Sequence, residues 1–429
     1  MSYSATGPET SLGEGARRQN AISLLLFLLI CLAFLTRFCI TPRVMNLFVD
    51  YTAETGAFYE KLHFGTYAIV ALLPLALFAR PIFLKGDEIG KFRALIRFIA
   101  ILVVLVALLM VTGRSGASGF FIDTYLTAGA AGLIMFTVSE ELRRGIGNVI
   151  LTMLLLSAAI ALFEVATEIR IMPFSEGEAA FRPTGLAEHP LTLGMMCAAA
   201  IGFVAVTRWR ILAKIGAILL LFIGCAASGA RFALLLASVE IFALLIFVPW
   251  TRLSPKQERQ AKLVVILVTL VVGAALVAAL LAGGLLSRFA EGIFDENAMS
   301  RITVYQVFSF TSLRDVLFGA DLNEILKLVN EKLKLPYIES TPVILIYLLG
   351  LPLALVFAGL VFWIFARLLR YAERPELIGI IVFFVAALSN NTLSTKTPTV
   401  AIFIVLLAAL ANGVPPIPYA LRREAAAAQ

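Results

Sequence analysis

The feature that most constrains this chain is a series of long apolar runs that recurs along almost its whole length. Each run spans roughly 17–25 residues, which matches the ~30 Å hydrocarbon core of a membrane at a helical rise of ~1.5 Å per residue. With 60% hydrophobic and 15% charged residues, the chain is far more apolar than an average soluble domain. Backbone groups in lipid must be hydrogen-bonded within their own segment, so these runs predict membrane-spanning helices.

The runs predict an all-α polytopic membrane protein with about twelve transmembrane helices. The predicted helices cover residues 21–38, 64–79, 98–112, 120–138, 147–168, 191–206, 211–227, 231–249, 263–286, 341–366, 376–390 and 398–412. Residues 1–20 form a polar tail, and residues 21–429 form a single membrane domain. The long connection at 287–340 contains two predicted short helices, 299–311 and 322–335, and the second has an apolar stripe at helical spacing.

The positions of lysine and arginine predict the orientation of these helices. Every second connection is basic, and the basic groups lie at 17–18, 80–97, 143–144, 208–214, 252–262, 367–374 and 422–423. Cytoplasmic connections of membrane proteins are enriched in Lys and Arg. We therefore expect both termini in the cytoplasm and the connection 287–340 on the outer face. Anionic lipid headgroups account for the net charge of +7, so no nucleic-acid partner is expected.

Two short sequences place arginines on the outer face, against this charge rule. RPTGLAEHPLTLG runs from Arg182 to Gly194, and SGAR ends at Arg231, where a predicted helix begins. A cation at the mouth of a membrane helix is costly unless an anion meets it. Guanidinium groups bind phosphate oxygens in pairs, and a helix N-terminus adds amide donors. The pattern favours a phosphate site, although each arginine alone could instead reach lipid headgroups or pair with a nearby glutamate.

The order of these motifs resembles that of bacterial O-antigen ligases and Wzy-type polysaccharide polymerases. In that family an R-x-x-G-x-x-x-H-P-x-x-x-G signature precedes an S-G-S-R element, a long outer loop and a polar motif that opens the next helix. The matching positions here are Arg182, Gly185, His189, Pro190 and Gly194, then 228–231, Arg301 with Tyr305, Phe318 with Gly319, and 339–341. The resemblance covers roughly residues 150–390.

The resemblance implies a GT-C-like helix bundle with a long periplasmic loop, acting at the periplasmic face of the bacterial inner membrane. The donor would be a glycan on undecaprenyl pyrophosphate, and the acceptor a sugar hydroxyl of a lipid-linked repeat unit. The reaction would invert the anomeric centre without a metal or another cofactor. A chain-length regulator, a polysaccharide co-polymerase, would be a possible partner. A pyrophosphate leaving group needs fixed cations where its negative charge develops.

The resemblance also assigns residues to roles. Arg182, Arg231 and Arg301 would bind the pyrophosphate, and Glu339 and His189 would be the candidate catalytic bases. Each base has a structural alternative, because His189 precedes a proline at a helix start and Glu339 is suited to a helix N-terminus. The other histidine of the chain, His63, is predicted to lie at the surface.

Three functions remain open on the sequence. Ligases of this family carry a histidine where this chain has Glu339, which favours a polymerase over an O-antigen ligase that transfers glycan to lipid A core or protein. A flippase of lipid-linked glycan would also need outer cations, but it would carry basic residues along a central cavity, and the predicted spans here hold almost none. The adjacent acids at 295–296 lack further ligands, so no metal site is expected.

Overall fold

All regular structure in the described part of the chain is helical. The structure, a computed structural model, describes residues 9–52, 58–79, 81–112, 118–174, 181–248, 254–282 and 296–411, and within these ranges it contains no strand. Each predicted helical segment contains a helix in its described part, and residues 249, 283–286 and 412, at the ends of three predicted helices, lie outside the described residues. The all-α prediction is therefore confirmed.

The long helices follow the apolar runs. They are α1 (Glu9–Cys39), α3 (Phe64–Phe78), α4 (Asp87–Val111), α6 (Thr127–Met135), α7 (Glu140–Thr167), α8 (Pro190–Val206), α9 (Ile211–Ala227), α10 (Arg231–Phe247), α11 (Pro255–Ala282), α15 (Thr341–Leu349), α16 (Leu351–Leu368), α17 (Arg374–Leu388) and α18 (Thr399–Leu410). Shorter elements are α2 (Pro42–Met45), η1 (Phe58–Lys61), α5 (Ser118–Phe120), the π-helix η3 (Phe121–Leu126), α12 (Glu296–Thr303), η5 (Val304–Ser309), α13 (Leu313–Phe318), α14 (Leu322–Leu333) and η6 (Thr392–Ser394).

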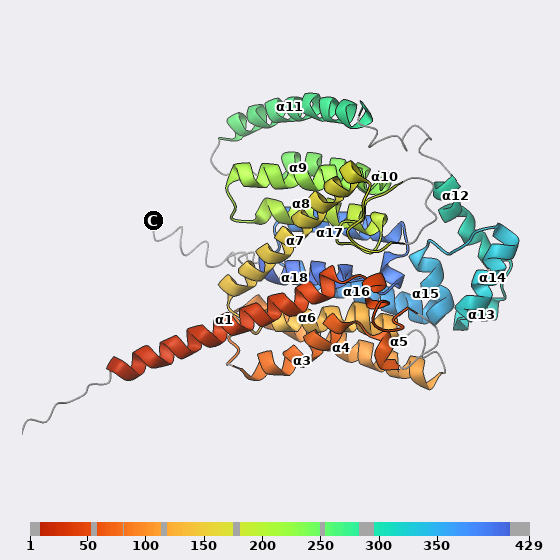
Figure 1. The fold of residues 1–429 in the computed structure, drawn as a ribbon, viewed down its shortest axis with the longest axis horizontal. Helices are drawn as coiled ribbons and strands as arrows, with labels where there is room; N and C mark the ends of the chain where they lie inside the picture. Colours follow the sequence, from red (N-terminus) through yellow and green to blue (C-terminus); the bar gives the residue numbers. More distant parts are fainter. Residues whose placement is uncertain are drawn as a thin grey trace, which may run out of the picture.

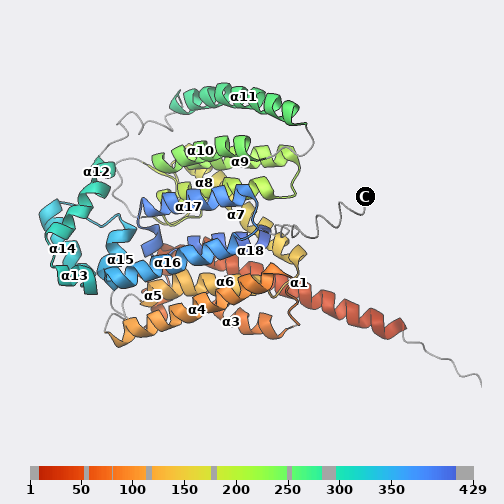
Figure 2. The same cartoon turned by 180° about the vertical axis from the view of Figure 1, so that it is seen from behind.

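The long helices lie side by side in one bundle, and its two ends differ (Figures 1 and 2). Helices α12, α13 and α14 cover one end, which we call the α14 end. α1 begins and α18 finishes at the opposite end, which we call the Ala411 end after the last described residue. Of the short helices in the long connection, α12 with η5 and α14 correspond to the two that were predicted, whereas α13 was not predicted. α14 packs on α15 and η5 through Ile325 and Val329.

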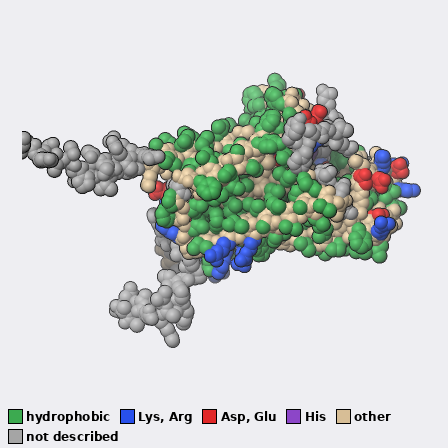
Figure 3. Space-filling model, turned by 90° about the horizontal axis from the view of Figure 1, so that it is seen from below, with side chains coloured by type: hydrophobic (Ala, Val, Ile, Leu, Met, Phe, Trp, Pro, Cys, Tyr) green, Lys and Arg blue, Asp and Glu red, His purple; other side chains and the backbone are tan. Residues whose placement is uncertain are grey.

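The outer surface of the bundle is suited to lipid. Four helical segments within the described ranges are long and apolar enough to cross a membrane, namely Gln19–Cys39, Asp87–Val111, Glu140–Thr167 and Leu351–Leu368. Their outward side chains are apolar and largely exposed, as for Leu32 (65%), Val104 (68%) and Leu355 (64%). Figure 3 shows one lateral face covered mainly by apolar side chains, with acidic and basic ones at the α14 end and further Lys and Arg side chains along the lower left edge of the view. These features identify a multi-pass membrane protein.

The interior of the bundle contains α6, α8 and α18, which are buried along nearly their whole length. α8 is rich in alanine and glycine and packs closely against α9 and α17. Small side chains allow helices in membranes to approach each other, which increases their van der Waals contact. α8 therefore holds its first turn, which carries part of the predicted site, in a fixed position.

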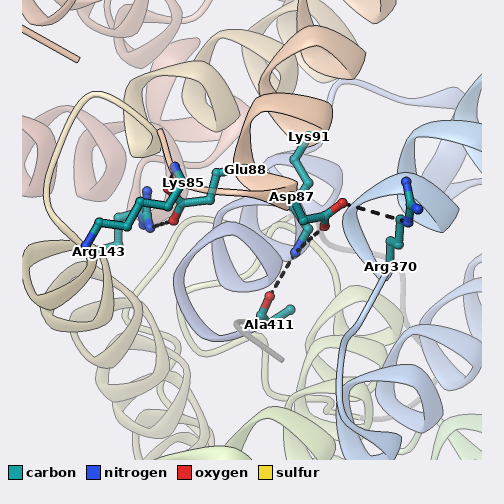
Figure 4. Close-up of polar contacts among 7 residues, drawn as sticks. All are labelled: Lys85, Asp87, Glu88, Lys91, Arg143, Arg370 and Ala411. Carbon is teal, nitrogen blue, oxygen red and sulfur yellow. Dashed lines mark hydrogen bonds and ion pairs between the residues drawn. The ribbon is translucent and has the colours of Figure 1, made fainter. Parts of the chain in front are cut away.

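At the Ala411 end, α4 and α7 begin before their apolar runs, and charged side chains form ion pairs there (Figure 4). The Lys91 Nζ atom donates to the Ala411 carbonyl at 2.9 Å and lies 3.8 Å from the Asp87 carboxylate. Arg370 also approaches Asp87, at 3.8 Å, and Arg143 pairs with Glu88. Because these pairs satisfy polar groups within the first turns, α4 and α7 begin earlier than the predicted 98 and 147.

The predicted helix 341–366 is wrong in one respect, because Gly350 divides it into α15 and α16. Gly350 has φ +81°, a left-handed conformation that side chains with a Cβ atom rarely adopt. A Cβ atom at this position would also collide with the backbone carbonyl of Leu317 in α13. The break thus lets α13 pack against the junction of the two helices.

Replacement of Gly350 by alanine should destabilise the protein. The positive φ alone costs roughly 1–2 kcal/mol, and the contact with Leu317 adds to this cost. Gly359 in α16 is the matched control, since a Cβ atom there meets no heavy atom within 4 Å. Thermal unfolding in detergent should show a lower midpoint for Gly350→Ala and an unchanged or higher midpoint for Gly359→Ala. Equal midpoints for the two variants would contradict this account.

Candidate functional site

The loop that carries the first motif is fixed by a buried carboxylate of α7. The Glu164 side chain is 0% exposed, and its Oε2 atom accepts hydrogen bonds from the backbone N–H groups of Thr184 at 2.8 Å and Gly185 at 2.9 Å. Its Oε1 atom accepts from the Ile171 N–H at 2.9 Å. Three charge-assisted bonds from one buried group hold both sides of the connection between α7 and α8.

The end of the same motif begins α8. The Nδ1 atom of His189 accepts from the Leu191 N–H at 3.1 Å, so the histidine is the N-cap residue, and Pro190 occupies the first helical position. Burial lowers the pKa of His189 to about 4, and nearby positive charges contribute to the shift. Those charges belong to Arg182, Arg43 and Arg301. The imidazole is therefore neutral at pH 7, with its proton on Nε2, and is a hydrogen-bond donor on that side.

The first and second motifs contact each other, although they are far apart in the sequence. The Arg182 Nε atom donates to the Ser228 carbonyl at 3.1 Å. A Cβ atom at Gly194 would lie 2.6 Å from both the Ser228 Oγ and the Ala230 Cβ atoms. Only glycine therefore allows the turn at 228–230 to lie against α8, and this turn leads directly into Arg231 at the start of α10.

The third group of predicted residues also comes together. The Arg301 Nε atom lies 3.2 Å from the Glu339 Oε2 atom, and the two side chains are 27% and 19% exposed. The Ser340 hydroxyl donates to the Tyr305 hydroxyl at 3.2 Å. Glu339 is thus an ion-pair partner of Arg301 in this structure and precedes α15 without forming its N-cap.

Sequence reasoning missed two arginines and an aromatic side chain next to His189. Arg43 and Arg170 each place the guanidinium 4.5 Å from the centre of the Phe174 ring, and that ring lies 5.8 Å from the imidazole of His189. The Arg170 side chain also donates to the Arg182 carbonyl at 2.9 Å. Both arginines lie in connections predicted to be on the outer face, so the same charge rule that drew attention to Arg182 would have identified them.

We call Arg43, Arg170, Arg182, Arg301 and His189 the arginine cluster. Its members come from three connections, after α1, between α7 and α8, and between α11 and α15, and they are linked by the contacts and charges described above. Arg231 follows the turn that Arg182 contacts and is partly exposed. Such a group of guanidinium and imidazole donors is suited to an anion with several oxygen atoms. Within the described ranges, no three His, Cys, Asp or Glu side chains lie close enough together to hold a metal ion.

The surface position predicted for His63 is wrong. His63 is 0% exposed, forms the N-cap of α3 and contacts the Ile40 carbonyl through Nε2 at 2.9 Å. Its backbone N–H donates to the buried carboxylate of Asp123, which also accepts from the hydroxyls of Tyr51 and Thr66, each at 2.7 Å. The histidine is buried because the connections at the α14 end fold over the helices instead of extending into solvent.

We compared the chain with models of known protein families and with the sequences of curated proteins, and it matches none of them. The assignment of a function therefore depends on the arrangement of the residues at the α14 end.

Replacement of Glu164 by glutamine should loosen the loop that carries Arg182 and His189. The amide provides one acceptor oxygen where the carboxylate provides two, so at least one buried N–H group loses its partner, at a cost of about 1–3 kcal/mol. Hydrogen exchange should become faster at Ile171, Thr184 and Gly185. The control is Glu168→Gln, since Glu168 is exposed just beyond the same helix. Unchanged exchange at all three amides in Glu164→Gln would contradict the role given to this carboxylate.

Proposed function

We propose that the protein is a polysaccharide polymerase of the inner membrane that acts at the periplasmic face. It transfers a glycan from undecaprenyl pyrophosphate to the sugar hydroxyl of a lipid-linked repeat unit. One observation carries the proposal: the motifs at 182–194, 228–231 and 301–339, which are distant in sequence, meet at one end of the bundle. A shared binding site gives a reason for this convergence that isolated lipid-facing arginines do not.

The arrangement at this end supports a role in stabilising a phosphate leaving group. When the bond between the anomeric carbon and the phosphate oxygen breaks, the oxygen keeps the electron pair and the pyrophosphate gains negative charge. Arg182 and Arg301 create a positive potential at His189. Arg231 is the first residue of α10, whose N-terminus carries a partial positive charge. Fixed cations and amide donors at this point lower the barrier because they interact more strongly with the transition state than with the ground state.

The contacts of the two predicted bases favour supporting roles for both. The neutral His189 uses Nδ1 to cap α8, so its Nε2–H is suited to donate to a phosphate or sugar oxygen. Glu339 is paired with Arg301 and is suited to orient that arginine or the acceptor sugar. A glutamate at this position, where related ligases have histidine, also favours chain extension over transfer to lipid A core.

The proposal includes the finer topology. We propose about twelve membrane spans in a GT-C-like bundle, with the α14 end in the periplasm and both termini in the cytoplasm. Lys91 of α4, Arg143 of α7 and Arg370 between α16 and α17 lie at the opposite, Ala411 end, which is consistent with the charge rule for cytoplasmic connections.

Loss of an arginine at the site should abolish polymer while single lipid-linked repeat units accumulate. Arg182→Ala or Arg231→Ala removes a charge-assisted contact of ~2–4 kcal/mol, which corresponds to a rate roughly 30- to 1000-fold lower. Lysine should restore little activity because it lacks the planar fork. The control is Arg314→Ala, because Arg314 is exposed on α13 at the same end. Polymer length and lipid-linked units would be measured at matched protein levels, and normal polymer in both site variants would refute the assignment.

Reporter fusions test the orientation. Fusions within residues 287–340 and near Pro183 should report the periplasm, and fusions near Lys256 and Arg370 should report the cytoplasm. The physical reason is that translocation of the basic connections is unfavourable. A cytoplasmic signal from residues 287–340 would place the arginine cluster away from the lipid-linked donor and would end the proposal.

A further inference from the structure

A small cavity lies at the α14 end, between the end of α1 and the start of α8. Its wall is mostly apolar, with Phe38, Leu186 and Met196 among its residues, and three polar side chains also line it. These are Thr41, Glu188 and Thr192. Glu188 directly precedes His189, so the loop that carries the arginine cluster also positions a carboxyl group at this cavity.

The carboxyl group of Glu188 differs from the other two acids of the site. Glu164 accepts three backbone hydrogen bonds, and Glu339 is paired with Arg301. The Oε2 atom of Glu188 is buried and has no hydrogen-bond partner in the described part of the chain. A buried acceptor without a partner is costly, so this atom is available for a donor that binds at the cavity.

The surroundings of Glu188 make its carboxylate more basic than usual. Burial raises its pKa to about 7, although a hydrogen bond from Thr397 and the charge of Arg37 oppose the shift. Tyr51, whose hydroxyl donates to Asp123, is a further titratable group whose charge interacts with Glu188. A general base is most effective when its pKa lies near the working pH.

We propose that Glu188 is the proton acceptor for the incoming sugar hydroxyl. This inference rests on the proposed function and adds a residue that the motif resemblance does not assign. The hydroxyl oxygen forms a bond to the anomeric carbon of the donor, and its proton moves to the Oε2 atom of Glu188. At the same time the bond from that carbon to the phosphate oxygen breaks, and the pyrophosphate leaves with the electron pair beside the arginine cluster.

The first test measures turnover of purified lipid-linked repeat units in vesicles that contain the full-length protein. Glu188→Gln keeps the size of the side chain but removes the base, so we expect kcat to fall about 10²- to 10⁴-fold with KM little changed. Glu188→Asp should recover part of the rate. The wild-type rate should fall as the pH drops below about 7, whereas the residual rate of Glu188→Gln should lose this dependence. The matched control is Glu168→Gln, which should retain the wild-type rate and pH profile.

The second test does not require activity. The folded state binds the Glu188 proton more tightly than the unfolded state, so the carboxyl favours folding at low pH, and this contribution disappears as the pH rises through about 7. The wild-type midpoint of thermal unfolding should therefore fall more between pH 5 and pH 8 than that of Glu188→Gln. Equal shifts in the two proteins would show that the carboxyl is not held in a desolvating environment and would overturn the inference.

The two tests separate this inference from the proposed function. If Glu188→Gln extends chains at the wild-type rate while Arg182→Ala does not, Glu188 is not the proton acceptor and the polymerase proposal stands. If wild-type vesicles do not extend lipid-linked units under any condition, the polymerase proposal fails and the inference fails with it. A rise in KM at constant kcat in Glu188→Gln would also overturn the inference, because it would assign Glu188 to substrate binding alone.

Discussion

The site at the α14 end depends on the hydrogen bonds that the buried Glu164 carboxylate accepts from the connection between α7 and α8. A loop of polar backbone at the end of a membrane helix bundle needs internal partners wherever it is buried. Glu164 provides them on both sides of the connection, at Ile171 and at Thr184 with Gly185. Arg182 lies just before the anchored Thr184, and Glu188 and the His189 cap lie between the anchored Gly185 and α8, so the anchor fixes the position of all three.

Much of the fold could be predicted from the apolar runs, because the cost of unpaired backbone groups in lipid leaves helices as the main solution. The helix boundaries were less predictable. Helix α4 extends back to Asp87 because two cations compensate its first turn, Lys91 from the next turn of the same helix and Arg370 from a distant part of the chain. Hydropathy records only the apolar part of a helix. The break at Gly350 depends on the approach of Leu317, a tertiary contact that no local pattern reports.

The site was predictable to a different degree. The order of motifs led to Arg182, Arg301 and Glu339, and the structure brings the last two into direct contact. It did not lead to Phe174 or Arg43, whose relation to His189 arises from packing between distant connections. Nor did it indicate the buried state of His63, because the sequence of a loop does not reveal whether neighbouring loops cover it.

The positive charge of the arginine cluster favours a departing anion but weakens a nearby carboxylate base. Burial is the main cause that lowers the pKa of His189 to about 4, and the charges of the nearby arginines add to it. The same charges would lower the pKa of a carboxylate in contact with them, and a carboxylate so stabilised is a weak proton acceptor. Glu188 lies one residue away, in an apolar cavity where burial raises its pKa to about 7. One loop therefore places a cation-rich environment, suited to a departing anion, beside an apolar one that keeps a carboxylate basic. In the proposed reaction, this separation would let one loop supply both the cations for the leaving group and a basic carboxylate.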